Sequence, residues 1–414
     1  MRAKGQTGVK RTDDTVSGTE DIQFTTFRET YKIVSFAMSV GMLYPDPKTA
    51  KKRLICIFLM LITVTPMSFT IILDIYYCWL RRDIINIIRH STIVGPFLGI
   101  FFKMLIFFYK RNPAKQIIDE IDNDYAKYNR LPPSHKIVIN SYLKSNVLYS
   151  EMGWTFTVLC CVLSFPGTAT ILTVYNFLFK DEPMKFMVHD VNRPFAPPEA
   201  RFESPFFELM FVYTCYCAMF YIINFVGFDG FFGLTINHAC LKIEMYCKAF
   251  EDAMKAKDKA EIHKNLVGVI QKQNRMFEFV DWIQDAFNIW LGAVLITTMI
   301  QICNCMYHIT EGAEMDARYV IYIIGVVIHI YLPCRYSSKL KYMFAATTTK
   351  LYCGGWERTH DARTRRTTLI MMARGHVPLE ITAFNLLVFD MDLFVAVLTQ
   401  NIIFDVHAAS ILKW

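Results

Sequence analysis

Residues 54–77 read LICIFLMLITVTPMSFTIILDIYY, from Leu54 to Tyr77, and this stretch sets the class of protein. A helix needs about 20 apolar residues to cross the hydrocarbon core of a bilayer, and this stretch is long enough. Six further apolar stretches follow along the chain. They cover residues 84–109, 147–179, 205–236, 286–309, 319–334 and 381–412. We therefore expect an all-α integral membrane protein with seven transmembrane helices.

The composition of the whole chain agrees with this expectation. Of its 414 residues, 53% are hydrophobic, and 34 Phe and 21 Tyr make it more apolar and aromatic than soluble domains usually are. The formal net charge of +7 is modest. The basic residues are scattered between apolar blocks instead of gathering on one face, which argues against nucleic-acid binding.

The cysteines and the known catalytic motifs give no sign of chemistry. Most of the 12 Cys lie in apolar stretches, where Cys acts as a small hydrophobic residue. Cys215 and Cys217, like Cys303 and Cys305, are two residues apart on expected helices and point in different directions, so we expect no metal site. The phosphate-binding, zinc-protease and serine-hydrolase motifs are missing. We expect neither an enzyme nor a cofactor.

The segments between several spans are expected to be helical as well. Residues 237–285 are charged but keep apolar residues such as Ile262 and Leu266 at helical spacing, which indicates amphipathic helices that continue out of the membrane. Residues 341–380 are similar, and Pro378 should end their helix before span seven. The expected parts of the chain are a cytoplasmic segment 1–53, spans one to four in 54–236, cytoplasmic helices 237–285, spans five and six in 286–340, a cytoplasmic helix 341–380, and span seven with a short extracellular end in 381–414.

The distribution of basic residues sets the orientation in the membrane. With the amino terminus in the cytosol, the cytoplasmic segments hold 34 of the 44 Lys and Arg, and the outer segments hold 8. Lys and Arg concentrate in cytoplasmic loops, so we expect a cytosolic amino terminus and an outer carboxyl terminus. A G-protein-coupled receptor has the opposite orientation, and the chain lacks its Asp-Arg-Tyr and Asn-Pro-x-x-Tyr motifs. That class is the alternative if the orientation is reversed.

Several ionisable residues fall inside the expected spans, where they are energetically costly and often functional. The side chain of Lys103 can reach towards the membrane interface, and Arg89 and Asp229 can pair across helices. Asp405 and His407 lie among small residues of the last span, which suits a water-lined path better than a wall facing lipid. The other ionisable residues of the spans are Asp74, Glu151, His329, Asp390 and Asp392.

The outer halves of spans two to six are dense in Phe, Tyr, Met, Ile and small residues. An apolar cavity there would accept a volatile or lipid-like ligand, although simple helix packing accounts for the same composition. A secondary transporter of small solutes is an alternative function. Such a protein needs polar residues near the midplane of broken helices, often in repeated halves, and this chain has no internal repeat.

The carboxyl-terminal third contains more specific motifs. YCGGWE at residues 352–357 precedes a basic segment, and LIMMARGHVPLEITA follows at residues 369–383. FDMDLFVAVL comes next at residues 389–398, and ILK stands at residues 411–413. This order resembles the insect odorant receptor family, where a Trp, a Met-Met-Ala-Arg-like stretch, a Pro, a Thr-Ala pair and a Leu-Phe recur. The inverted seven-span plan resembles that family along the whole chain, whereas residues 401–409 depart from its pattern.

The resemblance implies a tetrameric, ligand-gated, non-selective cation channel that this chain forms with shared odorant co-receptor subunits. The chain looks shorter in its second cytoplasmic region than the co-receptor, which is typical of a ligand-tuning subunit. Such a subunit lies in the plasma membrane of olfactory sensory neuron dendrites and opens when a small, volatile, apolar odorant or pheromone binds. The cytoplasmic parts of spans four to seven would form an oligomeric anchor, and the seventh spans would line the pore.

The resemblance also implies where the ligand and the gate lie. The family's odorant pocket lies among the outer halves of spans two to six. At that depth the expected ligand-binding residues are Ile88, Thr92, Leu159, Leu163, Phe211, Cys215, Met219 and Tyr322. The family's gate at the extracellular end aligns with His407 and Ile411, or with Ala408 and Leu412 in the alternative register. An apolar ring gates by dewetting, and His407 would make this contribution polar and pH-sensitive.

Overall fold

The chain folds into long helices, as seen in a computed structural model that describes residues 22–180, 184–189, 191–193, 195–311 and 317–412, with the backbone alone for 402–412. The helices are α1 (Phe27–Thr30), α2 (Lys32–Val40), η1 (Pro47–Thr49), α3 (Ala50–Leu80), α4 (Ile84–Tyr109), α5 (Arg111–Tyr128), α6 (Pro133–Ser145), η2 (Asn146–Gly153), α7 (Trp154–Phe179), η3 (Pro198–Phe202), α8 (Phe206–Asn224), η4 (Phe225–Asp229), α9 (Gly230–Met254), α10 (Lys259–Glu311), α11 (Ala317–Tyr352), η5 (Trp356–Arg358), α12 (Ala362–Gly375) and α13 (Met391–Leu412). Two short strands, β1 (Thr382–Ala383) and β2 (Leu387–Val388), precede α13. Segments η2 and η4 are π-helical.

Among the described residues, six helical segments are long and apolar enough to cross a membrane, and each covers all or nearly all of one of the expected spans one to six. The helix α13, with 22 residues, takes the place of the expected seventh. Large apolar side chains face outward from these helices; Phe58 and Phe69 on α3 are 65% and 60% exposed. Water disfavours an extended apolar surface of this kind, whereas lipid chains accept it. The expected class, an all-α integral membrane protein, is confirmed.

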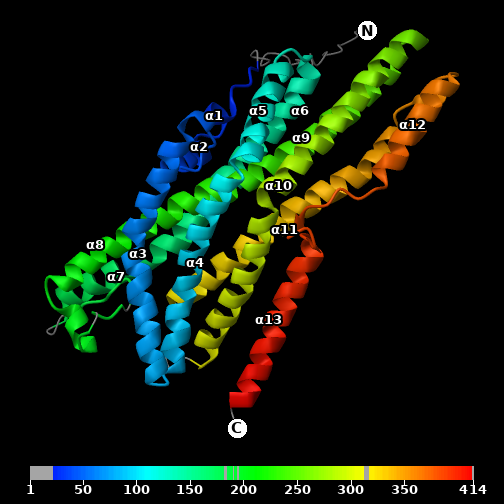
Figure 1. Ribbon diagram of the computed structural model, residues 1–414. Coiled ribbons are helices and arrows are strands. Elements are labelled where there is room, and N and C mark those ends of the chain that lie inside the picture. Colours follow the sequence, from blue (N-terminus) through cyan, green and yellow to red (C-terminus); the bar gives the residue numbers. More distant parts are fainter. Residues whose placement is uncertain (1–21, 181–183, 190, 194, 312–316, 413–414) are drawn as a thin grey trace, which may run out of the picture.

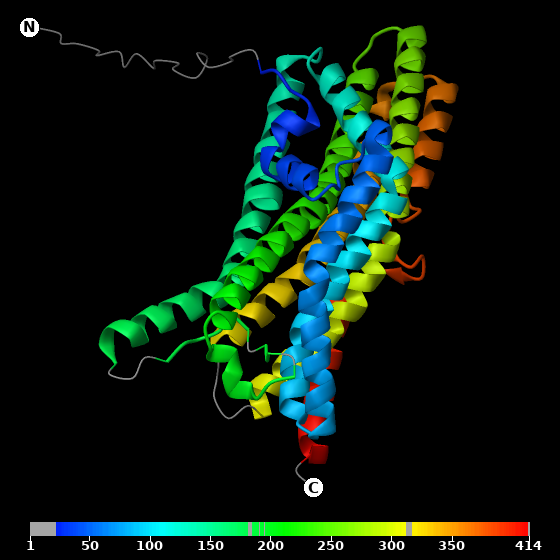
Figure 2. The same cartoon turned by 60° about the vertical axis from the view of Figure 1, so that its left-hand side comes forward.

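The helices are arranged lengthwise, with distinct segments at the two ends of the molecule (Figure 1). The helices α5, α6 and α12 lie at one end, while the α3–α4 connection and the last turns of α13 lie at the other (Figure 2). We call the first of these the basic end. It consists of α5, α6, α12 and the adjoining parts of α9, α10 and α11, and it includes the basic segments that the sequence analysis places in the cytosol.

Several helices continue without a break from the membrane part into the basic end. The helix α10 has 53 residues and α11 has 36. The helix α8 passes through the π-helical η4 directly into α9. The boundaries that we expected between membrane and cytoplasmic parts, at residues 237 and 286, therefore fall inside α9 and α10. At each boundary the apolar span and the amphipathic segment belong to one continuous helix. A movement inside the membrane part can reach the basic end along these helices.

The expected seventh span, residues 381–412, begins later than its composition indicated. Residues 382–388 form a small β-hairpin, with Thr382 paired to Val388, and the helix starts at Met391. The side-chain amide of Gln284 donates hydrogen bonds to the carbonyl and hydroxyl oxygens of Thr382, at 3.0 and 2.7 Å. The ring of Phe384 lies where a side chain on Gly292 would have to be. This docking on α10 is a tertiary contact, which apolar composition alone does not reveal.

The amino-terminal helices α1 and α2 pack against the membrane-spanning part. The backbone N–H groups of Ile33 and Val34 donate to Oε1 of Glu151, at 2.7 and 3.0 Å. The carboxylate therefore satisfies donors that have no partner within the first turn of α2. The close approach of Gly227 to the backbone of Met38 leaves no room for a Cβ atom. Glu151 is thus a buried structural residue that fixes the amino-terminal segment.

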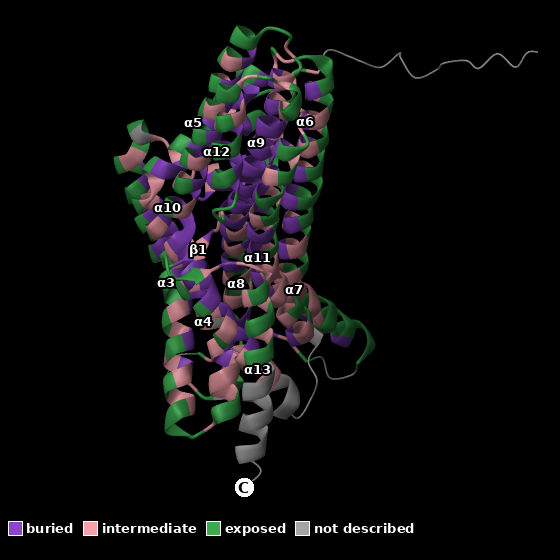
Figure 3. Cartoon of the chain, turned by 90° about the vertical axis from the view of Figure 1, so that its right-hand side faces the viewer, coloured by how far each residue is buried: buried purple, intermediate pink, exposed green. Residues whose placement is uncertain are grey.

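An aromatic core joins α4, η4, α9 and α10. The rings of Phe107 and Phe228 are 4.9 Å apart in an edge-to-face arrangement, and Phe228 makes the same kind of contact with Trp290 at 5.2 Å. Phe232 and Phe287 add a further edge-to-face pair at 5.1 Å. Such pairs contribute about 0.5–1.5 kcal/mol beyond the burial of their surface. Figure 3 shows that buried residues gather along α9, which is the central helix of the fold.

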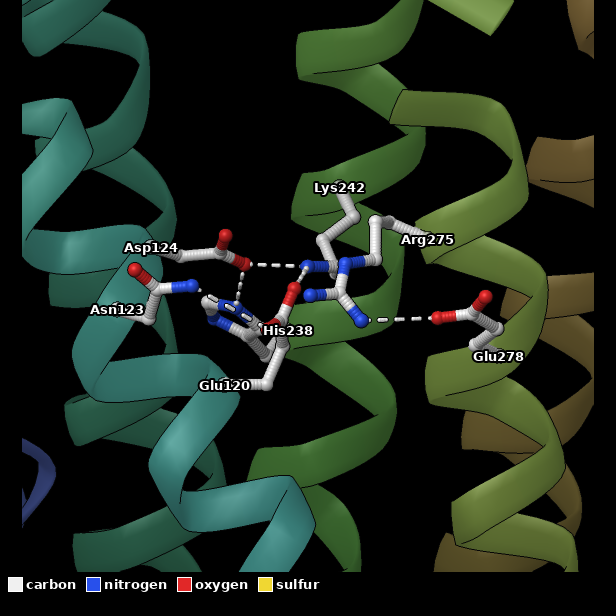
Figure 4. A network of polar contacts seen from close by, with 7 residues as sticks. All are labelled: Glu120, Asn123, Asp124, His238, Lys242, Arg275 and Glu278. Atoms are coloured by element: carbon white, nitrogen blue, oxygen red, sulfur yellow. Dashed lines mark hydrogen bonds and ion pairs between the residues drawn. The ribbon is translucent and has the colours of Figure 1, made fainter. Parts of the chain in front are cut away.

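A buried polar cluster connects α5 to α9 within the basic end (Figure 4). The Nζ atom of Lys242 lies 2.9 Å from Oε1 of Glu120, and it also pairs with Oδ2 of Asp124. Nε2 of His238 lies 3.0 Å from the same Asp124 oxygen. All four side chains are buried. One lysine thus bridges two carboxylates and reduces their mutual repulsion in a region of low dielectric constant.

The environment of Asp124 changes its pKa strongly. Burial alone would raise the pKa of this carboxyl group, but the hydrogen bond with His238 and the charge of Lys242 outweigh that effect and lower it to about 2. A carboxyl group with a lowered pKa stabilises the fold fully above its ordinary pKa. The stabilisation by Asp124 is therefore present at neutral pH and is lost only as the pH falls towards 2.

Replacing Lys242 by Met tests whether this cluster holds the basic end together. The substitution leaves Glu120 and Asp124 buried without their cation, and removing one partner of a buried pair costs about 3–5 kcal/mol. We expect a clear drop in the melting temperature of the detergent-solubilised protein. The control is Lys115→Met, which breaks an exposed pair with Asp119 on the same helix α5 and should cost less than about 1 kcal/mol. Equal melting temperatures for the two variants would contradict this role.

Candidate functional site

A cavity of about 160 Å³ lies between α3, α4, α7, α8, α10 and α11. Its walls are mostly apolar and comprise Met67, Pro96, Phe97, Trp154, Val158, Cys161, Val162, Phe165, Pro166, Val188, Cys217, Ala218, Tyr221, Phe225, Gly325 and Val326. The polar side chains on the walls are Thr157, His189, Thr214, Gln301, Tyr322 and His329. An engineered apolar cavity of about 150 Å³ holds a benzene molecule. The cavity here therefore has room for one small ring or a short chain.

Departures from regular helix geometry surround the cavity. Pro96 and Pro166 stand inside α4 and α7, where each removes a backbone N–H donor. Trp154 follows the π-helical η2, and Phe225 begins the π-helical η4. The indole Nε1 of Trp154 donates to the carbonyl oxygen of Phe225 at 2.9 Å, which joins the two irregular segments. Because π-helical turns are frequent at functional sites, this is a credible place for ligand binding.

One wall of the cavity rests on a buried ion pair. Nζ of Lys103 and Nε2 of His329 lie 2.8 and 2.9 Å from Oδ2 of Asp229. The ammonium group of Lys103 also lies over the ring of Phe225, 3.6 Å from its centre. The Lys103 and Asp229 side chains are each only 5% exposed. Asp229 therefore pairs with Lys103 and not with Arg89, and Lys103 points into the protein instead of towards the interface, because a carboxylate partner lies within reach.

His189 and Tyr322 also line the cavity, and His90 lies next to His189. Nδ1 of His90, on α4, lies 3.2 Å from Nε2 of His189 in the connection between α7 and α8. Burial lowers the pKa of His189 well below its ordinary value, with further lowering from His90 and the nearby arginines, so this imidazole is neutral at neutral pH. The hydroxyl of Tyr322 donates to the carbonyl oxygen of Thr92 at 3.1 Å. These contacts join α4 to the connection and to α11 on this side of the cavity.

The structure places the residues expected to bind ligand at different distances from the cavity. Tyr322 lines it, and Thr92 is buried directly behind Tyr322. Leu163 and Met219 are 44% and 52% exposed on the outside of α7 and α8. The remaining residues, which are partly buried without lining the cavity, are Ile88, Leu159, Phe211 and Cys215. Whether any of the eight binds ligand stays a prediction.

The expected ligand-binding residues lie on helices that line the cavity, and several of them are one position away from a lining residue. Val158, Thr214 and Ala218 line the cavity beside the expected Leu159, Cys215 and Met219. One residue along an α-helix turns the side chain by about 100°, from the cavity towards a neighbouring helix or lipid. The sequence did contain one usable signal, since His329 stood among the costly ionisable residues of the spans. The expected gate residues His407, Ala408, Ile411 and Leu412 lie outside the residues whose side chains the structure describes.

The fold and the cavity define a class: a multi-pass helical membrane protein with an internal, mostly apolar cavity. The family comparison is more specific. The family model described as 7tm Odorant receptor matches residues 83–400, so the chain belongs to the odorant receptor family.

The relatives of this chain are insect odorant receptors. Odorant receptor 10 of Aedes albopictus is 19% identical over 83% of this chain and 89% of its own length. Odorant receptor 13a of Drosophila melanogaster is 22% identical over 51% of this chain, and that alignment spans only 56% of the fly receptor. The solved structure of the olfactory receptor OR5 from Machilis hrabei in complex with eugenol matches with a TM-score of 0.73. It covers 93% of this chain and 98% of OR5 at 14% identity, which establishes the shared fold.

A close contact between α7 and α11 determines the width of the cavity and can be tested by substitution. A Cβ atom on Gly325 would lie 2.3 Å from Sγ of Cys161, so Gly325→Ala should cost about 1–3 kcal/mol through overpacking. We expect a lower melting temperature, with recovery in the double variant Cys161→Ala/Gly325→Ala, which removes the sulfur atom. Gly167→Ala on α7, where nothing lies within 4 Å, is the control. An unchanged melting temperature in Gly325→Ala would rule out this contact.

Proposed function

We propose that this chain is the ligand-tuning subunit of an odorant-gated, non-selective cation channel, which it forms with a shared co-receptor in the plasma membrane of olfactory sensory neuron dendrites. The observation that carries the proposal is an apolar cavity of about 160 Å³ inside a chain of the odorant receptor family. A receptor of the same fold, the olfactory receptor OR5 from Machilis hrabei, has been solved in complex with eugenol. The cavity is the proposed odorant site of this chain.

The walls of the cavity suit a small volatile molecule. Aromatic and aliphatic side chains such as Phe97, Trp154 and Val158 bind through dispersion and the removal of apolar surface from water, which yields about 25 cal/mol for each Å² buried. A ligand with several charges would lose its hydration without finding partners on these walls. The proposed ligand is therefore neutral, largely apolar, and about the size of one substituted ring.

The helix α11 offers a mechanical connection from the cavity to α13. Tyr322 and His329 of α11 line the cavity, and Lys341, further along the same helix, lies 2.7 Å from Glu380 and 3.2 Å from Asp390. The Ser338 hydroxyl accepts a hydrogen bond from the backbone N–H at the first residue of α13, at 2.9 Å. In the proposed mechanism, a ligand shifts α11, and the contacts at its far part transmit the shift to the pore-lining α13.

The basic end is the proposed anchor of the tetramer. Apolar side chains are exposed there outside the membrane-spanning helices; Leu369 and Ile370 on α12 are 52% and 63% exposed. Exposed apolar residues on a part of the chain that faces the cytosol favour burial against neighbouring subunits. The proposed partners are co-receptor subunits, and the surrounding lipid bilayer covers the remaining apolar surface.

Filling the cavity tests the proposed ligand site. Ala218 on α8 is 9% exposed and lines the cavity, so Ala218→Phe places a ring in the space that the ligand would occupy. We expect odorant-evoked currents, recorded in cells that express the co-receptor, to fall at least about tenfold, the effect of losing roughly 1.4 kcal/mol of binding. The control is Val212→Phe on the same helix, where the side chain is 69% exposed and should be tolerated. If both variants respond like the wild type, the ligand binds elsewhere.

The orientation is tested with epitope tags on both termini. The helix α1 and the last turns of α13 lie at opposite ends of the molecule (Figure 2), and the basic residues favour a cytosolic amino terminus. We expect antibodies to stain a carboxyl-terminal tag on intact cells, and an amino-terminal tag only after the cells are permeabilised. Staining of the amino-terminal tag on intact cells would instead support a receptor of the G-protein-coupled orientation.

A further inference from the structure

The imidazole of His329 lines the cavity, and one of its two nitrogens is already paired. Its Nε2 atom lies 2.9 Å from Oδ2 of Asp229, and a carboxylate oxygen only accepts hydrogen bonds. The proton of a neutral imidazole must therefore be on Nε2, which leaves Nδ1 as an acceptor with a free lone pair. Asp229 fixes the tautomer of His329 in the same way that carboxylates fix histidine ligands in metal sites.

The ion pair behind His329 keeps the ring neutral. Lys103 lies 2.8 Å from the same carboxylate oxygen, so the charge of Asp229 is already balanced. Protonation of His329 would bring a second positive charge next to Lys103, in a region where charges are poorly screened. The cation–aromatic contact between Lys103 and Phe225, at 3.6 Å from the ring centre, holds the ammonium group in place. The Lys103–Asp229 pair therefore preserves the acceptor state of Nδ1.

The ring of His329 is also held in one orientation. Trp154 stacks on it with the ring centres 5.8 Å apart and the planes 16° from parallel. Phe225 contacts it with the ring centres 5.2 Å apart. Trp154 is in turn fixed by its hydrogen bond to the carbonyl oxygen of Phe225. His329 borders the cavity, and its Nδ1 makes no hydrogen bond within the part of the chain that the structure describes.

We propose that His329 selects ligands that carry a hydrogen-bond donor, so that the preferred ligand is a small alcohol or phenol whose hydroxyl group donates to Nδ1. This inference rests on the proposed function, because it takes the cavity as the odorant site and names the class of odorant. The hydroxyl group would face the wall formed by Trp154, Phe225 and His329, and the hydrocarbon part would lie against the apolar walls around Val158 and Phe165.

Tyr322, Thr214 and Gln301 on the walls differ from His329 in how they meet a ligand hydroxyl group. The hydroxyl of Tyr322 already donates to the carbonyl oxygen of Thr92, and that of Thr214 donates to the carbonyl oxygen of Met210 at 2.7 Å. Gln301 both donates and accepts, so it can bind an alcohol and an ether alike. The Nδ1 lone pair of His329 can only accept, as can the lone pairs of these two hydroxyl groups, but an imidazole nitrogen is the stronger acceptor, and an ether offers it no proton.

Matched pairs of alcohols and their methyl ethers test the proposal by direct binding. The probes are 4-methylphenol with 4-methylanisole, 2-phenylethanol with its methyl ether, and hexan-1-ol with its methyl ether. Titration calorimetry uses the full-length protein in lipid nanodiscs. We expect each alcohol to bind about two- to tenfold more tightly than its ether, the range set by one net hydrogen bond. In His329→Phe this ratio should fall to about one while the ethers still bind.

Two further variants separate His329 from its neighbours. Thr214→Val removes another hydroxyl from the cavity wall and should keep the wild-type ratio. The proposal would be overturned if the preference for alcohols over ethers were lost in Gln301→Leu but kept in His329→Phe. So would equal affinities for alcohols and ethers in the wild-type protein, or no binding of either. An alcohol preference in binding without any odorant-evoked current would support the role of His329 and overturn only the proposed channel function.

Discussion

The arrangement of the membrane part depends on one electrostatic constraint, the pairing of Lys103 with Asp229 among apolar helices. An isolated charge at this depth is unfavourable by several kcal/mol, so each residue must meet the other. Lys103 is on α4 and Asp229 is at the end of η4, and His329 brings α11 to the same carboxylate. Three segments that are far apart in the sequence are thereby fixed at one point. The cavity lies beside that point, so its shape follows from the need to neutralise these charges.

The same segments extend out of the membrane and meet a second buried charge cluster. The π-helical η4 continues into α9, where Lys242 pairs with two carboxylates of α5 and His238 forms a hydrogen bond with one of them. The continuous helix of η4 and α9 is thus held by electrostatic pairs in the membrane part and in the basic end, and α11 joins it at both levels through His329 and through the pair of Lys350 with Glu244. Continuous helices held at two levels transmit displacement instead of absorbing it, which is what a receptor needs if its ligand site and its pore are separate.

The sequence revealed the features that depend on local composition and missed those that depend on neighbours. Residues 84–109 were expected as a span and form α4 with these bounds, because a run of apolar residues between charged ones determines both ends. The start of α13 at Met391 was missed, since the hairpin before it exists through its contact with Gln284. The expected ligand-binding residues Leu159, Cys215 and Met219 lie one position from residues that line the cavity. All faces of these spans are apolar, so the sequence carries no amphipathic signal for the side that faces the cavity.

The residues that line the cavity are separate from those that support its wall, and this separation bears on the proposed choice of ligand. This chain and OR5 share their fold at only 14% sequence identity, so the fold tolerates changes in most side chains. Apolar walls bind most small hydrocarbons through surface burial, which discriminates weakly. Strong discrimination between ligands requires a polar atom with a fixed protonation state and a fixed orientation towards the ligand. Here Lys103 does not line the cavity, yet it neutralises the carboxylate that orients His329. Substitutions behind the wall can therefore change ligand preference without changing any residue that the ligand touches.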